Sequence, residues 1–362
     1  MTEIKLVKLR KEFNSLVAVN DLTLTIDDGT LVSLLGPSGC GKTTTLRMIA
    51  GLTTPTSGEI YFDDRLVNDL RPQERKVGLV FQDYAIFPNM NAFDNIAFGL
   101  KIRGLPREEI RKRVLEVAEL LNIKGILGSM PRRMSLSELQ SVALARTLVT
   151  NPSVLLLDEP LSNLDAALRA RMRAELKRLQ REIGQTVIYV THDQLEAIAI
   201  SDKIAIMNLG ILHQYGTPEE IYNNPKTRFV AGFIGSPPMN FIECTFIEED
   251  GGFLDLGVGK VDVSTYKGAI KEGCSSPEVT LGARPEDIRI GRERMSGNSL
   301  EVRVEAYEPL GSEAVIDVML GETLVRVTAP VTFTARAGDK AYIEFDSRKV
   351  HVIDRKTEKV VI

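Results

Sequence analysis

The sequence is poor in cysteine, and its cysteines form no recognisable pattern. The 3 cysteines among 362 residues, Cys40, Cys244 and Cys274, stand at unrelated spacings, with no Cys-x-x-Cys pair and no histidine nearby. A disulfide framework needs paired cysteines, and a zinc site needs clustered cysteine and histidine ligands. The sequence supports neither, and a reducing cytosol is the expected compartment.

Long apolar runs and an excess of positive charge are also missing. No stretch reaches the roughly 18 apolar residues that cross a bilayer, and the start, MTEIKLVKLRKEF, lacks the apolar core of a secretion signal. Lys and Arg number 45 against 49 Asp and Glu, which gives a net charge of -4, and aromatic residues make up 6%. Nucleic-acid binders usually carry a basic stripe with interleaved aromatics, so the composition disfavours that class.

The composition is otherwise ordinary for a folded chain, with 43% hydrophobic and 26% charged residues and no long repeat. Short apolar runs at residues 31–35, 154–157 and 186–190 predict buried strands. A helix with apolar residues at steps of three and four lies between the last two runs, and strand, helix, strand predicts a parallel sheet. Residues 106–123 have helical periodicity on a charged background, which indicates a helical insertion.

The character of the chain changes near residues 235–238, Gly-Ser-Pro-Pro. Just before this point, Thr217-Pro218-Glu219-Glu220 predicts a helix start, with Thr as the N-cap and Pro at the first helical position. Beyond it, segments such as residues 301–304, 323–327 and 342–345 alternate at period two, which predicts strands. The last part of the chain is therefore expected to be a separate β domain.

One glycine-rich segment fits a phosphate-binding pattern. Residues 36–43 match G-x-x-x-x-G-K-[ST] and stand between a predicted strand and a helical stretch, which disfavours a chance glycine-rich turn. Glycines let backbone N–H groups surround phosphate oxygens, the lysine adds positive charge at the outer phosphates, and the threonine hydroxyl can ligate Mg²⁺. The candidate nucleotide-binding residues are Gly36, Pro37, Ser38, Gly39, Cys40, Gly41, Lys42, Thr43 and Thr44.

Two other predicted strands end in polar residues. Asp158 closes the apolar run 154–157, where a carboxylate is costly unless it faces a cation or a hydrogen-bond network, so we expect it to hold Mg²⁺. Glu159 would then lie beside the metal and can polarise an attacking water as general base. His192 follows another strand, at the sheet edge where ligands bind. The alternatives are a strand-end acid in a turn and a structural histidine.

In their order and spacing, these residues resemble the ATPase subunits of ABC transporters, specifically the maltose-type importers of sugars and related polar solutes. The resemblance covers the whole chain and includes Gln82, the Ser-Asn-Leu-Asp segment at 162–165, and residues 230–240, which resemble the junction to a C-terminal OB-fold regulatory domain. It implies an α/β P-loop ATPase core, a mainly parallel sheet with helices on both faces, in residues 1–235. A helical subdomain at about 84–150 and an all-β OB-fold-type domain at 236–362 complete the expected fold.

The resemblance also implies roles for individual residues and partners for the chain. Glu159, His192 and Gln82 would be catalytic, Thr43, Gln82 and Asp158 would hold Mg²⁺, and Phe13 would stack on adenine unless it is a plain exposed aromatic. Asp165 belongs to the segment that crosses to the second ATPase subunit. Residues 84–90, Tyr84 to Met90, would receive a helix of the membrane permease, although half of such residues would be ordinary packing. An extracytoplasmic solute-binding protein would complete the system, and the chain itself would be peripheral, at the cytoplasmic face of the cell membrane.

One motif departs from the family pattern. Where the family has Leu-Ser-Gly-Gly-Gln, this chain has Met134-Ser135-Leu136-Ser137-Glu138. Ser135 is retained as a candidate for the opposite nucleotide, but a leucine obstructs close approach and a carboxylate repels phosphate. We therefore expect a dimer with a different ATPase subunit, with a slow homodimer as the alternative. Two other functions stay open: a soluble ABC-type ATPase acting on nucleic acid or ribosomes, and a regulatory nucleotide-binding partner.

Overall fold

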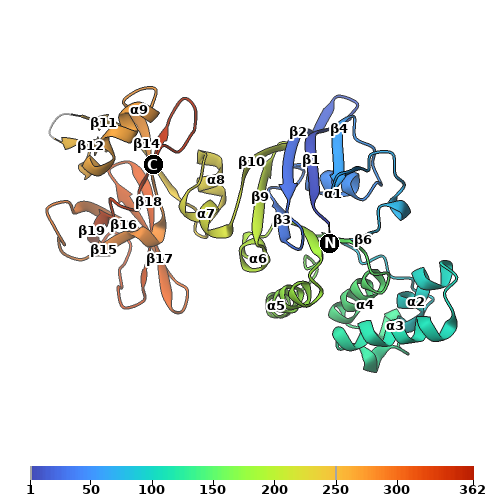
Figure 1. The fold of residues 1–362 in the computed structure, drawn as a ribbon. Coiled ribbons are helices and arrows are strands. Elements are labelled where there is room, and N and C mark those ends of the chain that lie inside the picture. The colour runs from blue at the N-terminus through green and yellow to red at the C-terminus, as the bar shows by residue number, and fades with distance from the viewer. Residues whose placement is uncertain (1, 249–250) are drawn as a thin grey trace. The chain divides into compact units, whose positions relative to one another are not determined.

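The computed structural model describes residues 2–248 and 251–362, and the chain forms two compact units, Met1–Pro218 and Glu219–Ile362 (Figure 1). The division falls at the start of α7 (Pro218–Asn223), earlier than the expected boundary after residue 235. The helices α7 and α8 (Arg228–Phe233) are tied to the second unit because Arg284 donates hydrogen bonds to the Tyr222 carbonyl and, at 2.7 Å, to the Ile234 carbonyl.

A six-stranded sheet forms the centre of the first unit, in the order β10-β9-β3-β8-β7-β6. Strands β9, β3, β8, β7 and β6 run parallel, and β10 pairs antiparallel with β9. The parallel core predicted from the strand-helix-strand order is therefore confirmed. The strands span β3 Leu31–Leu35, β6 Val77–Val80, β7 Val154–Asp158, β8 Thr186–Thr191, β9 Lys203–Asn208 and β10 Ile211–Gly216.

This unit also contains a second, antiparallel sheet, in the order β2-β1-β4-β5, whose pairing was not among the expectations from the sequence. This sheet and α1 lie on one face of the central sheet, and α5 and α6 lie on the other (Figure 1). Apolar side chains form a shared core with the central sheet on each face. The elements span β1 Ile4–Phe13, β2 Leu16–Ile26, β4 Ser57–Phe62, β5 Arg65–Leu66, α1 Lys42–Ile49, α5 Ala166–Ile183 and α6 Gln194–Ile200.

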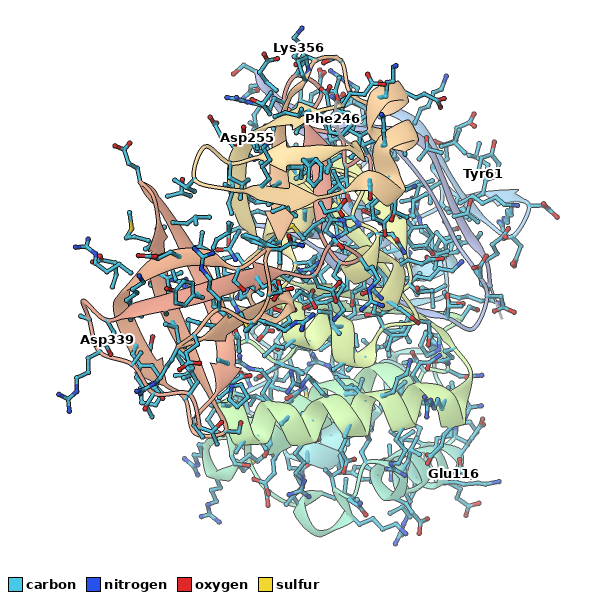
Figure 2. The ribbon with its side chains drawn as sticks, turned by 90° about the vertical axis from the view of Figure 1, so that its left-hand side faces the viewer. Tyr61, Glu116, Phe246, Asp255, Asp339 and Lys356 are labelled. Atoms are coloured by element: carbon cyan, nitrogen blue, oxygen red, sulfur yellow. The ribbon has the colours of Figure 1, made fainter. Side chains whose placement is uncertain are left out.

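The expected helical insertion consists of α2 (Ala92–Ile102), α3 (Arg107–Leu120) and α4 (Leu136–Leu148), which share one apolar core. Helix α3 buries Val114 and Ala118 in that core, whereas Glu116, labelled in Figure 2, lies exposed on its outer side. This is the amphipathic pattern that the sequence showed. In the part of the chain that the structure describes, none of the helices is both long and apolar enough to cross a membrane.

The second unit contains two five-stranded sheets, β13-β12-β11-β14-β20 and β15-β19-β16-β17-β18, which enclose a common apolar core. The predicted β domain is confirmed, and helix α9 (Lys267–Gly273) lies among its strands. Its strands span β11 Asn240–Ile247, β12 Phe253–Asp255, β13 Lys260–Asp262, β14 Glu278–Ala283, β15 Ile288–Gly291, β16 Leu300–Pro309, β17 Glu313–Leu320, β18 Thr323–Pro330, β19 Lys340–Phe345 and β20 His351–Asp354.

Candidate functional site

The order of the parallel strands brings the predicted site residues to one edge of the central sheet. The neighbours β3, β8, β7 and β6 all end at this edge. In a parallel sheet, ligands bind outside the carboxyl ends of the strands. The loop after β3 is the glycine-rich segment 36–41, and the ends of the other three strands supply His192, the Asp158-Glu159 pair and Gln82.

The glycine-rich loop encloses its own lysine. Lys42 is only 4% exposed, and its Nζ donates hydrogen bonds of 2.8 Å to the carbonyl oxygens of Gly36 and Pro37. Gly41 has φ 100°, and a Cβ there would lie 2.3 Å from the Ala18 carbonyl oxygen, so only glycine fits. The loop therefore places a cation and the N-terminus of α1 at one point, which suits a phosphate group.

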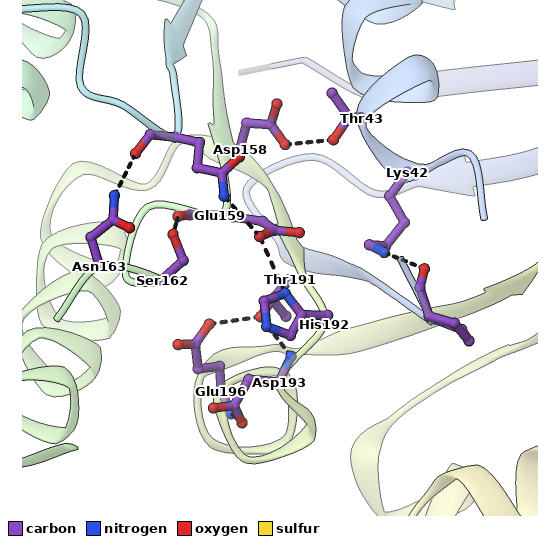
Figure 3. A network of polar contacts seen from close by, with 12 residues as sticks. Lys42, Thr43, Asp158, Glu159, Ser162, Asn163, Thr191, His192, Asp193 and Glu196 are labelled. Carbon is purple, nitrogen blue, oxygen red and sulfur yellow. Dashed lines mark hydrogen bonds and ion pairs between the residues drawn. The ribbon is translucent and has the colours of Figure 1, made fainter. Parts of the chain in front are cut away.

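Thr43 and Asp158 meet across the sheet edge. The Thr43 hydroxyl donates a 2.9 Å hydrogen bond to Asp158 Oδ1 (Figure 3). Burial raises the pKa of the Asp158 carboxyl and the neighbouring Glu159 adds to this, while the Thr43 hydrogen bond opposes it. A buried carboxylate with a hydroxyl oxygen at hand is a hard-oxygen donor set, which fits Mg²⁺.

Glu159 is the centre of a second group of contacts. Its Oε2 lies 3.2 Å from His192 Nδ1 and accepts a 3.3 Å hydrogen bond from Gln82 Nε2 (Figure 3). The backbone of Glu159 has φ 45°, an uncommon conformation for a non-glycine residue, and its N–H donates to the Val190 carbonyl at 3.0 Å. The structure thus brings Glu159, His192 and Gln82 together, as the sequence analysis expected.

The segment 162–165 continues this group. The Ser162 hydroxyl donates to the Glu159 carbonyl at 3.0 Å, and Asn163 Nδ2 donates to the Gln82 carbonyl at 3.3 Å. Asp165 is the N-cap of α5, where it accepts a 2.9 Å hydrogen bond from the Leu168 N–H. The Asp165 carboxylate therefore caps the N-terminus of α5 within this chain.

Ser135 is not part of this group. It lies at the start of α4, and its N–H and hydroxyl donate to the same Glu138 oxygen, Oε2, at 2.7 and 2.8 Å. The Glu138 carboxylate thus caps the N-terminus of α4. The sequence contains the signal for this arrangement, because Ser-x-x-Glu is a capping box, although Glu138 was expected only to repel phosphate.

Phe13, the candidate for adenine stacking, lies on the surface. Phe13 is the last residue of β1; its ring is 47% exposed, and Lys11 Nζ lies 4.9 Å from the ring centroid.

In the segment 84–90, Tyr84 is buried, and Arg146 donates hydrogen bonds to the carbonyls of Tyr84 and Ala85 at 2.8 and 2.7 Å. Phe87 is half-buried against Phe98, with 4.6 Å between ring centroids.

Sequence reasoning missed a polar network behind His192. Glu196 is 3% exposed and accepts hydrogen bonds from the hydroxyls of Tyr189 and Thr191. Arg169 on α5 forms ion pairs with Asp193, at 3.2 Å, and with Glu196, at 3.6 Å. The available signal was the presence of hydroxyl and carboxylate side chains in and after an apolar strand, since buried polar groups require partners.

Comparisons with known proteins agree with this architecture. Residues 19–162 match the family described as ABC transporter, residues 235–288 the MalK OB fold domain, and residues 281–353 the TOBE domain. The chain is 46% identical to the trehalose/maltose import ATP-binding protein MalK of Thermococcus litoralis, covering 100% of both. It is 41% identical to the sn-glycerol-3-phosphate import ATP-binding protein UgpC of Bartonella bacilliformis, covering 99% of both.

A solved structure resembles the first part of the chain. The ATP-binding cassette MJ0796, in a dimeric post-hydrolysis state bound to ADP and Pi, is similar with a TM-score of 0.54 and 32% identity. The match covers 59% of this chain and 98% of that chain. The expected P-loop ATPase core and the OB-fold-type domain are therefore both confirmed.

Proposed function

The chain belongs to the family of ABC transporter ATP-binding proteins, and from this premise we propose that it powers the uptake of a sugar or related polyol. The family and the site agree on its activity as an ATPase. The observation that carries the proposal is the meeting of Lys42, Thr43, Asp158, Glu159 and His192 at one sheet edge, in a chain similar over its full length to import ATP-binding proteins.

Each residue has a distinct task in the proposed reaction. Lys42 releases the loop carbonyls and binds the outer phosphates of ATP, while the N–H groups of the loop and of α1 hold the others. Glu159 accepts the proton of the attacking water, and His192, which contacts its carboxylate, orients the γ-phosphate. Thr43, Asp158 and Gln82 would hold Mg²⁺, which neutralises charge on the phosphate oxygens when bound.

The solute class rests on the relatives. Those described above are named for import of trehalose or maltose and of sn-glycerol-3-phosphate. The test is to co-express the chain with the permeases encoded beside it, reconstitute the complex in liposomes with the cognate binding protein, and measure uptake of labelled maltose, trehalose and glycerol phosphate. ATP-driven uptake of one of these is expected. ATP hydrolysis that responds instead to RNA or ribosomes would favour the soluble nucleic-acid ATPase.

We propose that the chain acts as a peripheral subunit on the cytoplasmic face of a membrane, with two permease subunits docked near Tyr84–Met90. The described contacts suit this role because Arg146 and Asn95 fix the backbone of the segment while Phe87 and Ile86 stay partly exposed. A fixed backbone with accessible apolar side chains suits the binding of a partner helix. The second unit, with its OB-fold match, is the proposed regulatory part.

Replacing Phe87 with Asp should prevent assembly with the permeases or uncouple hydrolysis from transport. An unpaired charge in an apolar interface costs about 3–5 kcal/mol, so assembly should weaken by more than about 100-fold. Affinity purification of the complex and a transport assay measure both effects. Ile102→Asp is the matched control, because Ile102 is an exposed apolar residue of the same helical insertion. A Phe87→Asp complex that assembles and transports normally places the interface elsewhere.

We propose that the working dimer pairs this chain with a different ATPase subunit. In this arrangement the intact residues here, from Lys42 to His192, complete one site with a normal signature segment from the partner. The second site would combine the partner's P-loop with Leu136 and Glu138 of this chain. Leu136 is 51% exposed, and the Glu138 carboxylate already accepts the hydrogen bond of the Ser135 hydroxyl. That site would serve as a clamp that binds nucleotide without efficient hydrolysis.

Restoring the family residues tests this asymmetry. The variant Leu136→Gly, Ser137→Gly, Glu138→Gln removes the side chain and the charge that oppose phosphate. In a heterodimer, turnover should rise by about twofold at most, because one site of two is gained. A homodimer should gain on the order of tenfold, because both sites are repaired. Native mass spectrometry gives the stoichiometry, and two copies of this chain in the working transporter refute the asymmetric dimer. No gain in the variant would mean that the altered segment supports full hydrolysis as it stands.

A further inference from the structure

Arg169, in the first turns of α5, joins two segments that both contact Glu159. One guanidinium nitrogen donates to Asp193 Oδ2 at 3.2 Å, in the loop that carries His192. Another donates to the Leu164 carbonyl at 3.0 Å, in the segment 162–165. A single side chain therefore connects the two segments, and the planar fork of arginine suits this double contact.

Glu196 provides the charge that Arg169 faces. It is buried, and its Oε2 accepts a 2.9 Å hydrogen bond from the Tyr189 hydroxyl. The same oxygen accepts a 2.7 Å hydrogen bond from the Thr191 hydroxyl (Figure 3). Its Oε1 lies 3.6 Å from Arg169 Nε, an ion pair without a hydrogen bond. A buried carboxylate is unfavourable without a cation, so Arg169 and Glu196 stabilise each other.

The network reaches His192 through the end of β8. Thr191 directly precedes His192, and its hydroxyl donates to Glu196 while accepting the Asp193 N–H at 3.0 Å. Asp193 also caps α6 by accepting the Glu196 N–H at 3.1 Å. The residues on both sides of His192 are thus held by groups that Arg169 contacts, whereas the His192 side chain is free to face Glu159.

We infer that Arg169 and Glu196 form a positioning pair, which keeps the loop of His192 aligned with the segment 162–165 and thereby sets His192 against Glu159. The segment also touches Glu159, through the hydrogen bond from Ser162 to its carbonyl. Movement of either segment relative to the other would therefore change the surroundings of the general base. The inference rests on the proposed function, in which Glu159 and His192 act on the γ-phosphate.

The test compares Arg169→Met and Arg169→Lys in the assembled transporter. Arg169→Met should lower kcat for ATP hydrolysis by about 10- to 100-fold, as expected for a misplaced catalytic group, and leave KM for ATP within about twofold. Arg169→Lys keeps the charge opposite Glu196 and should recover part of the loss. Arg171→Met is the matched control, because Arg171 is an exposed arginine of the same helix and should leave kcat unchanged.

A double-mutant comparison separates positioning from general destabilisation. The rate of ATP hydrolysis is measured under single-turnover conditions in a His192→Ala background. Adding Arg169→Met should not lower this rate further, because the pair acts through His192. Equal losses in both backgrounds would overturn the inference, as would a loss confined to KM. If Arg169→Met fails to fold, Glu196→Gln replaces it; it keeps the shape and the hydroxyl contacts and should show the same kcat loss. Absence of ATP hydrolysis by the unmodified complex would instead refute the proposed function.

Discussion

Lys42→Ala is expected to abolish most nucleotide binding. The lysine is the cation placed inside the glycine-rich loop, and the outer phosphates of ATP would replace the loop carbonyls as its partners. Hydrogen bonds to charged groups contribute about 1.5–3 kcal/mol each, so the affinity for ATP should fall on the order of 10²-fold. Isothermal titration calorimetry of the purified full chain with MgATP measures this directly.

The controls must distinguish lost binding from a damaged loop. Lys42→Met keeps the aliphatic stem packed and removes only the charge, so it should lose affinity as Lys42→Ala does. Lys124→Ala removes an exposed lysine paired with Glu119 and should bind ATP normally. Thermal unfolding without nucleotide should be similar for Lys42→Met and the unmodified chain. Unchanged ATP affinity in both Lys42 variants would mean that the glycine-rich loop is not the nucleotide site.

The site at the sheet edge could be predicted because its signals are local. The glycine-rich loop, the apolar run before Asp158 and the strand before His192 each depend on a few consecutive residues. Parallel strands end at the same edge, so recognising them as parallel was enough to expect these groups together. The helix of residues 106–123, observed as α3 (Arg107–Leu120), was equally readable from its period.

Features that depend on pairing between distant segments could not be predicted in this way. Strand β1 pairs with β4 across about fifty residues, Ile4 opposite Phe62, and alternation alone shows which face is buried but not which strand is the neighbour. The contact of Arg146 with the carbonyls of Tyr84 and Ala85 is similarly distant. The Arg169–Glu196 contact joins two helices, α5 and α6, and it depends on how these helices are placed relative to each other.

Glu159→Gln should preserve ATP binding and suppress turnover by on the order of 10²-fold or more. The amide has the same size, so the contacts with His192 and Gln82 can be kept, but it cannot accept a proton from water. Phosphate release by the assembled transporter should therefore fall while calorimetry gives an ATP affinity close to that of the unmodified chain.

The geometry around Glu159 makes this separation of binding and turnover a strong test. Its backbone, not its carboxylate, is bonded to Val190 and Ser162, so the substitution leaves the unusual φ of 45° and the chain path in place. Glu182→Gln, which weakens only an exposed ion pair with Arg178 on α5, is the control and should keep full turnover. Loss of ATP binding in Glu159→Gln would identify Glu159 as a structural residue, and normal turnover would place the general base at another side chain.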